Sequence, residues 1–411
     1  MKKIIVCVMA IILLVSSYSC ASVMPPQNDQ HDHNFSTEES VVIDDTLYTA
    51  RESRVWSFRQ PLFVNLPGMV LLNDQETHHG GIHLNYINKR NAKEYYFCFD
   101  ALCNHNDCIG GYGGDFHYVE HWIWSDADQH LYATALLPSD ISIIDKSDGN
   151  LYKIDIETQE YKQVYRGNGN PIRSLYANDR YIYLTRLHAS GYTEIVRFDP
   201  IQQKAQTMSP PSEHQFSTLI VSGDTILVNF TNDYLQMYRT DDSFSAYEAV
   251  DIPLQPLYVD GGNVIFAQDA NGASVGWGAS ARSICVYDME TEQTSTVISY
   301  SEEDISVRIV GYGGGYVYYL LNPLSGGTSV HPGRILYRVS LSGGEAEPMV
   351  NFGMDYTELE YELYVDMVCV YDSTIYCHLK TDSKSYFVDR YGILTLEDDG
   401  FWTFSKLPVG D

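Results

Sequence analysis

The sequence lacks most of the motifs by which enzyme classes are recognised. It carries no H-E-x-x-H zinc pair and no P-loop lysine motif, and we expect no nucleophile elbow, the sharp strand-to-helix turn that bears a G-x-S-x-G serine. These absences count against the zincins, the P-loop NTPases and the α/β-hydrolases. They do not exclude an enzyme that gathers scattered carboxylates at one opening of a repeat fold, because such a set has no spacing pattern.

Long apolar patterns are also missing. From Val41 onward no stretch repeats its apolar residues at the 3.6-residue period of a helix, which counts against a helical domain. The longest apolar run, Ile4–Val15, is about a dozen residues long, whereas a bilayer-spanning helix needs roughly 20. We therefore expect a domain built from strands and no membrane-spanning helix.

Positive charge is scarce. Lysine and arginine number 26 against 54 aspartates and glutamates, which gives a formal net charge of −28. A nucleic-acid binder needs a cationic face for the phosphates, so DNA and RNA are excluded as expected partners. The acidic balance is read as a source of solubility, with local sites for Ca²⁺ or cationic ligands as the alternative.

The N-terminus has the form of an export signal. Lys2 and Lys3 precede the apolar run, and small residues then lead to Cys20 in the string SSYSC. This tail is similar to a bacterial lipobox, in which the cysteine is lipidated, although Ser17 stands where leucine is usual. We expect a lipoprotein signal peptide over 1–19 and attachment to the extracytoplasmic face of the cell membrane through acyl chains such as palmitate. Ordinary signal cleavage and secretion is the alternative.

The residues after Cys20 are polar up to about residue 40 and predict a flexible tether, 20–40, followed by one domain over 41–411. In that domain short apolar runs alternate with turns made of Gly, Asn and Asp, and tyrosine is abundant, with 33 residues. Each hairpin such as RSLYANDRYIYLTR is followed by a second, such as EIVRFDPIQQKAQTM. The repeating unit therefore has four strands, at intervals of roughly 40 to 60 residues, which is typical of β-propeller blades.

We therefore predict an all-β chain with a single β-propeller of about seven four-stranded blades, preceded by the signal peptide and the tether. An open solenoid or two stacked sandwiches are the alternatives. The string VVIDDTLYTAR, 41–51, is expected as an extra strand that joins the first or the last blade. The predicted units lie near 62–108, 119–165, 172–209, 216–250, 257–298, 307–350 and 366–407.

Three strings carry a resemblance to a known family: Gly313–Tyr319, the ILYR strand Ile335–Arg338 with the turn Ser342–Gly344, and YYFCFDALCNHNDC over Tyr95–Cys108. They resemble the β-propeller lipoproteins of unknown function of Firmicutes, especially clostridia, and distantly the YWTD propellers of the LDL-receptor type. The resemblance implies fold and location and carries no activity that could be transferred. The chain departs from the related propeller families in having degenerate turns and no WD, kelch or Asp-box signature.

The densest group of reactive side chains is Cys98, Cys103, His105 and Cys108. Three thiolates and an imidazole suit a tetrahedral Zn²⁺, but the spacing matches no familiar finger. In an exported protein two of the thiols can instead form a disulfide, and buried or free thiols are the third alternative. Cys369 and Cys377 flank one hairpin turn: a three-residue loop would place them opposite each other, where a disulfide could form, and a two-residue loop would place them on opposite sheet faces.

The stretch from Cys108 to Trp124 combines glycines with aromatics and histidines. Trp122 and Trp124 alternate with Ile123, as in an inner strand, and a stacking platform for sugar is the sharper interpretation. His117 and His121 are candidate ligand-binding or metal-binding residues beside it, with exposed loop histidines as the alternative. Aspartates at first-hairpin turns are expected to serve turn geometry.

These observations favour a non-catalytic, surface-anchored propeller that binds an extracellular protein or glycan. A glycoside hydrolase or lyase with carboxylates at the central opening is the runner-up, and a scaffold for envelope assembly is the third hypothesis. No catalytic residue and no cofactor other than the possible Zn²⁺ is predicted.

Overall fold

A computed structural model describes most of the domain but not the N-terminal region before residue 55. The ranges described are 55–57, 63–72, 85–97, 119–135, 149–158, 160–168, 170, 172–187, 193–208, 216–222, 225–230, 235–240, 247–252, 254–276, 281–302, 304–325, 329–330, 335–352, 363–381, 390–398 and 400–407. The signal peptide, Cys20, the strand expected at 41–51 and the cysteine string all lie outside them. Within these ranges no helix has the length and apolar character to cross a membrane.

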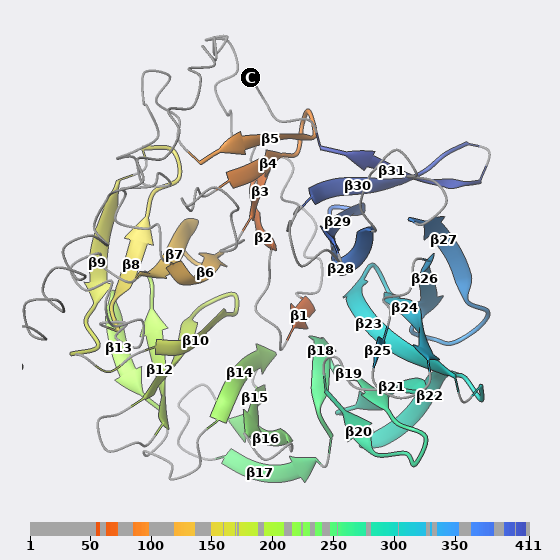
Figure 1. Cartoon of the computed structure of the whole chain (residues 1–411). Coiled ribbons are helices and arrows are strands. Elements are labelled where there is room, and N and C mark those ends of the chain that lie inside the picture. Colours follow the sequence, from red (N-terminus) through yellow and green to blue (C-terminus); the bar gives the residue numbers. More distant parts are fainter. Residues whose placement is uncertain are drawn as a thin grey trace, which may run out of the picture. The chain divides into compact units, whose positions relative to one another are not determined.

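Residues Thr37–Gly410 form one compact unit, and its described part is built from strands. Four sheets are antiparallel meanders of four strands in chain order, in a propeller-like arrangement (Figure 1). Their positions match the first four predicted units, which confirms the prediction there. The strands are β2 (Phe63–Leu66), β3 (Met69–Leu72), β4 (Asn85–Asn88), β5 (Lys93–Tyr96); β6 (Val119–Ser125), β7 (His130–Ala135), β8 (Leu151–Ile154), β9 (Tyr161–Tyr165); β10 (Ile172–Ala177), β11 (Ile182–Leu187), β12 (Thr193–Asp199), β13 (Lys204–Thr207); β14 (Phe216–Ser222), β15 (Thr225–Phe230), β16 (Leu235–Thr240) and β17 (Tyr247–Ile252).

The remaining strands form two larger sheets. One has six strands, in the order β1-β18-β19-β21-β22 with β20 beside β19, and the other has nine, in the order β27-β26-β24-β23-β28-β29-β30-β31 with β25 beside β24. Both sheets contain four-stranded meanders at the predicted places. β1 and β20 are added to the six-stranded sheet and β25 to the nine-stranded one, in which the pairing of β23 with β28 joins two meanders. The strands are β1 (Val55–Ser57), β18 (Pro256–Asp260), β19 (Asn263–Gln268), β20 (Ser274–Val275), β21 (Ser283–Asp288), β22 (Gln293–Ser299), β23 (Ile305–Gly313), β24 (Tyr316–Ser325), β25 (Ser329–Val330), β26 (Ile335–Ser340), β27 (Glu347–Asn351), β28 (Leu363–Tyr371), β29 (Thr374–Thr381), β30 (Arg390–Leu396) and β31 (Trp402–Lys406).

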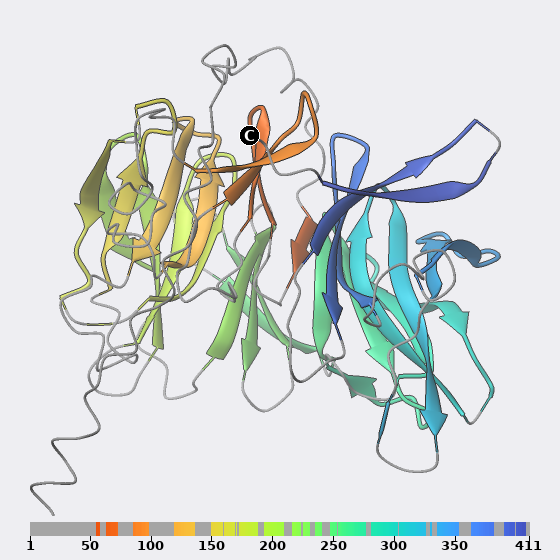
Figure 2. The ribbon, with the colours of Figure 1, turned by 45° about the horizontal axis from the view of Figure 1, so that its top comes forward.

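The junction in the nine-stranded sheet depends on glycine. β23 and β28 pair in parallel at Gly311↔Val368 and Tyr312↔Cys369, and the strands run side by side in Figure 2. A Cβ atom at Gly311 would lie 2.3 Å from the carbonyl oxygen of Val368, which no side chain tolerates. Glycine therefore allows two first strands to approach closely enough to share ladder hydrogen bonds.

Alternating side chains give each sheet two apolar faces, and this places the core between sheets. In β6, Trp122 and Trp124 join one buried cluster, whereas Ile123 between them joins another. Successive side chains of a strand point to opposite faces, so a strand that is buried on both sides reads as a continuous apolar run. A single unit could not bury both faces alone, which is why the units stack.

The second-hairpin turns repeat one hydrogen-bonding device. The carboxylates of Asp155, Asp199 and Asp288 each accept bonds from the backbone N–H groups two and three residues later, at 2.8–3.1 Å. Gln203 and Glu292, four residues after Asp199 and Asp288, have φ of 52° and 57°, which closes the turn. Aspartate favours such turns because its side chain replaces a backbone acceptor.

The first and last meanders also contact each other. The ring of Phe63 in β2 lies edge-on to Tyr391 and tilted to Tyr376, and the Tyr371 hydroxyl donates to the carbonyl oxygen of Phe63 at 3.1 Å. The Lys89 ammonium adds an ion pair with Asp372. Side-chain packing, rather than an exchanged strand, therefore joins the two ends of the described domain.

Candidate functional site

A row of β-bulges marks the first strands of the meanders. In six of the described first strands one residue is inserted against the second strand, so its neighbours pair while it does not. Bulges bend a strand, re-aim side chains and occur often next to binding and active sites. The inserted residues are Glu120 in β6, Arg173 in β10, Ser217 in β14, Leu257 in β18, Val310 in β23 and Asp366 in β28.

Asp366 is the charged exception among the bulge residues whose burial is described. Leu257 and Val310 are buried apolar residues, as the interior of a repeat fold requires, whereas Asp366 is 4% exposed. Burying an ionised carboxylate costs several kcal/mol unless a partner compensates it. A buried aspartate at this position would destabilise the fold unless an opposite charge compensates it. The structure shows such a partner.

The partner is Arg308 on the neighbouring first strand β23. Its Nη2 atom donates to Oδ1 of Asp366 at 2.9 Å, and its side chain is 24% exposed. The other carboxylate oxygen lies 3.5 Å from Nδ1 of His378, which is fully buried on β29 and stacks on Tyr391 with ring centroids 5.0 Å apart. The Arg308–Asp366–His378 cluster thus joins the two meanders beside their parallel junction.

The difference in exposure among the three side chains of this cluster limits the reactions that it can take part in. His378 and Asp366 are the acid–base groups, but they are 0% and 4% exposed, so a ligand in solvent reaches neither side chain directly. Arg308 is the member that reaches the surface, and the carboxylate behind it fixes its orientation. A guanidinium held in place by a buried carboxylate is suited to binding an anionic group with two acceptor oxygens, such as a carboxylate or a phosphate.

Most of the predicted site residues lie elsewhere or outside the described residues. Five of them lie outside the described residues: Cys98, Cys103, His105, Cys108 and His117. The disulfide, the zinc site and the ligand-binding role considered for these residues therefore stay predictions. Within the described ranges no group of three or more potential metal-ligating side chains gathers. The backbone of His121 belongs to β6, directly after the bulge at position 120.

The two tryptophans are placed by the structure. Trp122 and Trp124 are 5% and 6% exposed and pack among apolar side chains of the first two sheets. Little of either ring is accessible for a sugar to stack on, so their burial favours the core interpretation. The ligand-binding interpretation remains a prediction.

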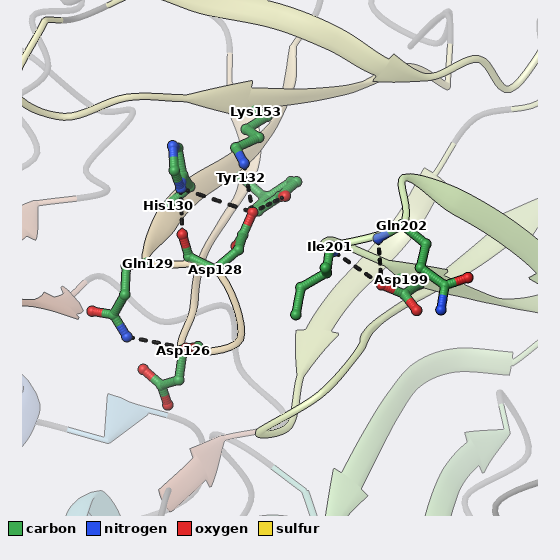
Figure 3. A network of polar contacts seen from close by, with 9 residues as sticks. All are labelled: Asp126, Asp128, Gln129, His130, Tyr132, Lys153, Asp199, Ile201 and Gln202. Carbon is green, nitrogen blue, oxygen red and sulfur yellow. Dashed lines mark hydrogen bonds and ion pairs between the residues drawn. The ribbon is translucent and has the colours of Figure 1, made fainter.

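First-hairpin aspartates tie the turns to neighbouring strands. Asp260 accepts from the Tyr312 hydroxyl at 2.6 Å, and Asp372 pairs with Lys89. Asp128 accepts from the Tyr132 hydroxyl at 2.8 Å and from Lys153 Nζ at 2.6 Å, beside the Asp199 turn (Figure 3). Burial and the nearby Asp128 carboxylate raise the pKa of Tyr132 far above its ordinary range. These aspartates therefore have structural partners as well as turn geometry.

The three described cysteines are free thiols. Tyr371 pairs with Thr374 across a two-residue loop, so Cys369 stands opposite Tyr376 and Cys377 stands opposite Val368. Cys377 lies within one apolar cluster and Cys369 packs against another, which confirms that the short loop separates them onto opposite faces. Burial raises the pKa of Cys369 to about 12.

One pattern escaped the sequence reasoning. Residues Gly272–Gly276 spell GASVG, which matches G-x-S-x-G. The structure places Ser274 in the two-residue strand β20, where its hydroxyl accepts the backbone N–H of Gln255 at 2.7 Å. A nucleophile elbow projects its serine from the turn between a strand and a helix, whereas this serine lies within a short strand, so it lacks the turn of an elbow. The bulges, by contrast, leave no sequence signal.

Known proteins resemble the chain in fold. No family model matches the sequence and no curated protein does. The propeller domain of the Trilobed protease from Pyrococcus furiosus, described as having an open velcro topology, is 13% identical with a TM-score of 0.52, over 88% of this chain and 99% of that one. An oligogalacturonate lyase from Vibrio parahaemolyticus is 11% identical with a TM-score of 0.51, over 85% and 92%. At such identities the likeness shows the fold alone, and that fold is a β-propeller.

Proposed function

We propose that this chain is an exported, lipid-anchored β-propeller that binds an anionic ligand at its first strands and does not turn it over. The proposal includes Cys20 as the lipidated residue and an extracytoplasmic location. We also propose that the six-stranded sheet forms one further blade and the nine-stranded sheet two, which gives seven blades in all. In this division β1 and β20 are additional strands, and the pairing of β23 with β28 is a junction between two blades.

The binding proposal rests on the difference in exposure among the three side chains of the Arg308–Asp366–His378 cluster. Arg308 is accessible and is oriented by a buried carboxylate, whereas the groups able to move protons are enclosed. An enzyme of acid–base type needs those groups within hydrogen-bond reach of its substrate. The arrangement therefore suits recognition of a carboxylate or phosphate group better than its chemical conversion.

A carbohydrate-active enzyme is the second candidate, and one observation favours it. Glu120 and Asp366 occupy bulge positions of two first strands, so two carboxylates occur at equivalent places of the fold. Glycoside chemistry uses two carboxylates about 5 to 10 Å apart, so this candidate requires the two side chains to meet at one opening. The oligogalacturonate lyase shares the fold at 11% identity, which makes acidic glycans a reasonable part of a ligand panel.

A binding panel with product analysis tests the proposal. The mature chain is titrated with oligogalacturonates and hyaluronan fragments as acidic ligands, and with dextran and xylo-oligosaccharides as neutral controls, while chromatography follows each ligand for 24 hours. We expect an acidic ligand to bind and to be recovered intact. Cleavage of a ligand, abolished by Asp366→Asn or Glu120→Gln, would establish the second candidate, and binding of neutral ligands alone would contradict the anionic one.

A further inference from the structure

The first described strand, β1, lies where the sequence did not predict a strand. The extra strand expected at 41–51 lies outside the described residues, and β1 is a different strand, which pairs antiparallel with β18 at Val55↔Asp260, Trp56↔Val259 and Ser57↔Tyr258. Both views show this short strand beside β18 (Figures 1 and 2). β18 is the first strand of its meander, and its other edge pairs with β19.

The chain's connectivity makes this position informative. Five residues, 58–62, link β1 to β2, and a chain of that length reaches at most about 20 Å. β2 begins a different sheet, which contacts the β28–β31 meander and the β6 sheet rather than β18. β1 therefore belongs to the sheet of β18, whereas β2, the next strand in the chain, belongs to the first four-stranded sheet. These two sheets are not consecutive in the sequence.

The edge of β18 that β1 covers is a strand-accepting surface. A first strand without a second neighbour presents a row of backbone N–H and C=O groups that another extended segment can pair with. β1 pairs at only three positions, and each backbone hydrogen bond contributes a modest net amount, so this strand is a weak occupant.

The occupant also shows which peptide chemistry fits. Residues 51–60 read RESRVWSFRQ, with three arginines and one glutamate in a chain of net charge −28. Val55, which follows Arg54, is in register with Asp260, whose carboxylate accepts the Tyr312 hydroxyl. Basic residues flanking an aromatic strand match an acidic propeller, because opposite charge favours encounter and fixes register.

We infer that the inner edge of β18 is a binding site for extended basic peptides, and that β1 is its resident occupant, which a peptide segment in trans displaces. The competing peptide pairs antiparallel with Tyr258, Val259 and Asp260 through its backbone, as β1 does. The site shares no residue with the Arg308–Asp366–His378 cluster, and its test uses a basic peptide instead of an anionic ligand, so failure of the inference is distinguishable from failure of the proposed function.

A reversible lock on β1 tests the inference in the full mature chain. Residues directly opposite in an antiparallel pair have Cα atoms about 4.5–5.5 Å apart, which is within the span of a disulfide, so a Trp56→Cys, Val259→Cys double variant can be closed by oxidation and opened by reductant. A fluorescein-labelled peptide RESRVWSFRQ is the probe, and its arginine-to-glutamate version is the control. Peptide mapping verifies the engineered disulfide, and near-ultraviolet circular dichroism verifies the fold in both states.

We expect the peptide to bind the reduced variant at least about 10-fold more tightly than the oxidised one, because a site occupied in cis loses affinity in proportion to its occupancy. A Trp56→Pro variant, which removes one backbone donor from β1, should bind more tightly than the wild type. Equal affinity for the oxidised and reduced forms, or no binding to either, would overturn the inference. So would equal binding of the control peptide.

Discussion

At the scale of the residue, burial decides what the reactive side chains can do. Asp366 and His378 are enclosed, Arg308 reaches the surface, and Cys369 and Cys377 lie in apolar clusters on opposite faces of their hairpin. Each of these residue types is associated with chemistry in other proteins. In this fold the partly exposed side chain of Arg308 is the member of the set that a ligand can contact.

The buried thiols give the first prediction. Burial raises the pKa of Cys369 to about 12 and raises that of Cys377 further, so neither forms a thiolate at ordinary pH. In native protein their alkylation by iodoacetamide should stay slow and should not rise between pH 7 and pH 9, whereas both should react at once in 6 M guanidinium. Peptide mapping by mass spectrometry gives the rates. Fast labelling in the native state, or a Cys369–Cys377 disulfide, would contradict the structure.

The second-hairpin aspartates give a prediction about turn chemistry. Asp199→Ala removes the acceptor for the N–H groups of Ile201 and Gln202, and we expect a loss of about 1 kcal/mol of unfolding free energy in urea titrations. Asp199→Asn keeps a side-chain oxygen at the same place and should lose less than half of that. If the two variants are equally destabilised, charge rather than turn geometry explains the aspartate.

At the scale of the element, glycine and the bulges control how strands meet. Gly311 lets β23 and β28 approach, and a Cβ atom there would collide with the Val368 carbonyl oxygen at 2.3 Å. Gly311→Ala should therefore cost about 2 kcal/mol or more of unfolding free energy, within the range of overpacked cores. Gly262→Ala is the matched control, because nothing lies within 4 Å of a Cβ atom at that turn position. Equal unfolding free energies for the two variants would show that the β23–β28 junction is not a close contact.

The elements differ in how far the sequence could predict them. Apolar alternation and turns of Gly, Asn and Asp located the meanders well, because a strand buried on both faces and a tight turn each demand particular residue types. For Cys369 and Cys377 the sequence left the loop length open, and the two-residue loop of the structure selects the alternative in which they lie on opposite faces. The bulges at Asp366 and its counterparts were not predictable, since an inserted residue needs no special type, and the pairing of β1 with β18 depends on contacts between distant segments.

At the scale of the whole molecule, the many buried tyrosines set an alkaline limit on stability. Burial raises the pKa of Tyr318 and Tyr376 to about 12 and that of Tyr176, Tyr312 and Tyr319 beyond it. The unfolded chain releases these protons near pH 10, whereas the folded chain holds them to a higher pH. Stability contributed by these groups is therefore complete below about pH 10 and is lost as the pH rises toward the folded values.

We expect the free energy of unfolding to fall steeply between about pH 10 and pH 12, together with a cooperative rise in tyrosinate absorbance at 295 nm. Circular dichroism recorded on the same samples shows whether ionisation and unfolding coincide. A gradual titration of all tyrosines centred near pH 10, with the sheet signal intact, would mean that these rings are accessible and that the packing between sheets is looser than described.

The central claim is that a β-propeller uses Arg308, oriented by the buried Asp366, to bind an anionic group. The most direct measurement is the affinity of the best acidic ligand for the wild type, Arg308→Lys and Arg338→Lys by isothermal titration calorimetry. Arg338 also pairs with a carboxylate, Glu347, but on β26, away from the first strands, so its variant controls for loss of an ion pair. Lysine keeps the charge and loses the guanidinium fork, so we predict a 10- to 100-fold weaker Kd for Arg308→Lys and a change below about twofold for Arg338→Lys. Equal Kd values for the wild type and both folded variants would contradict the claim.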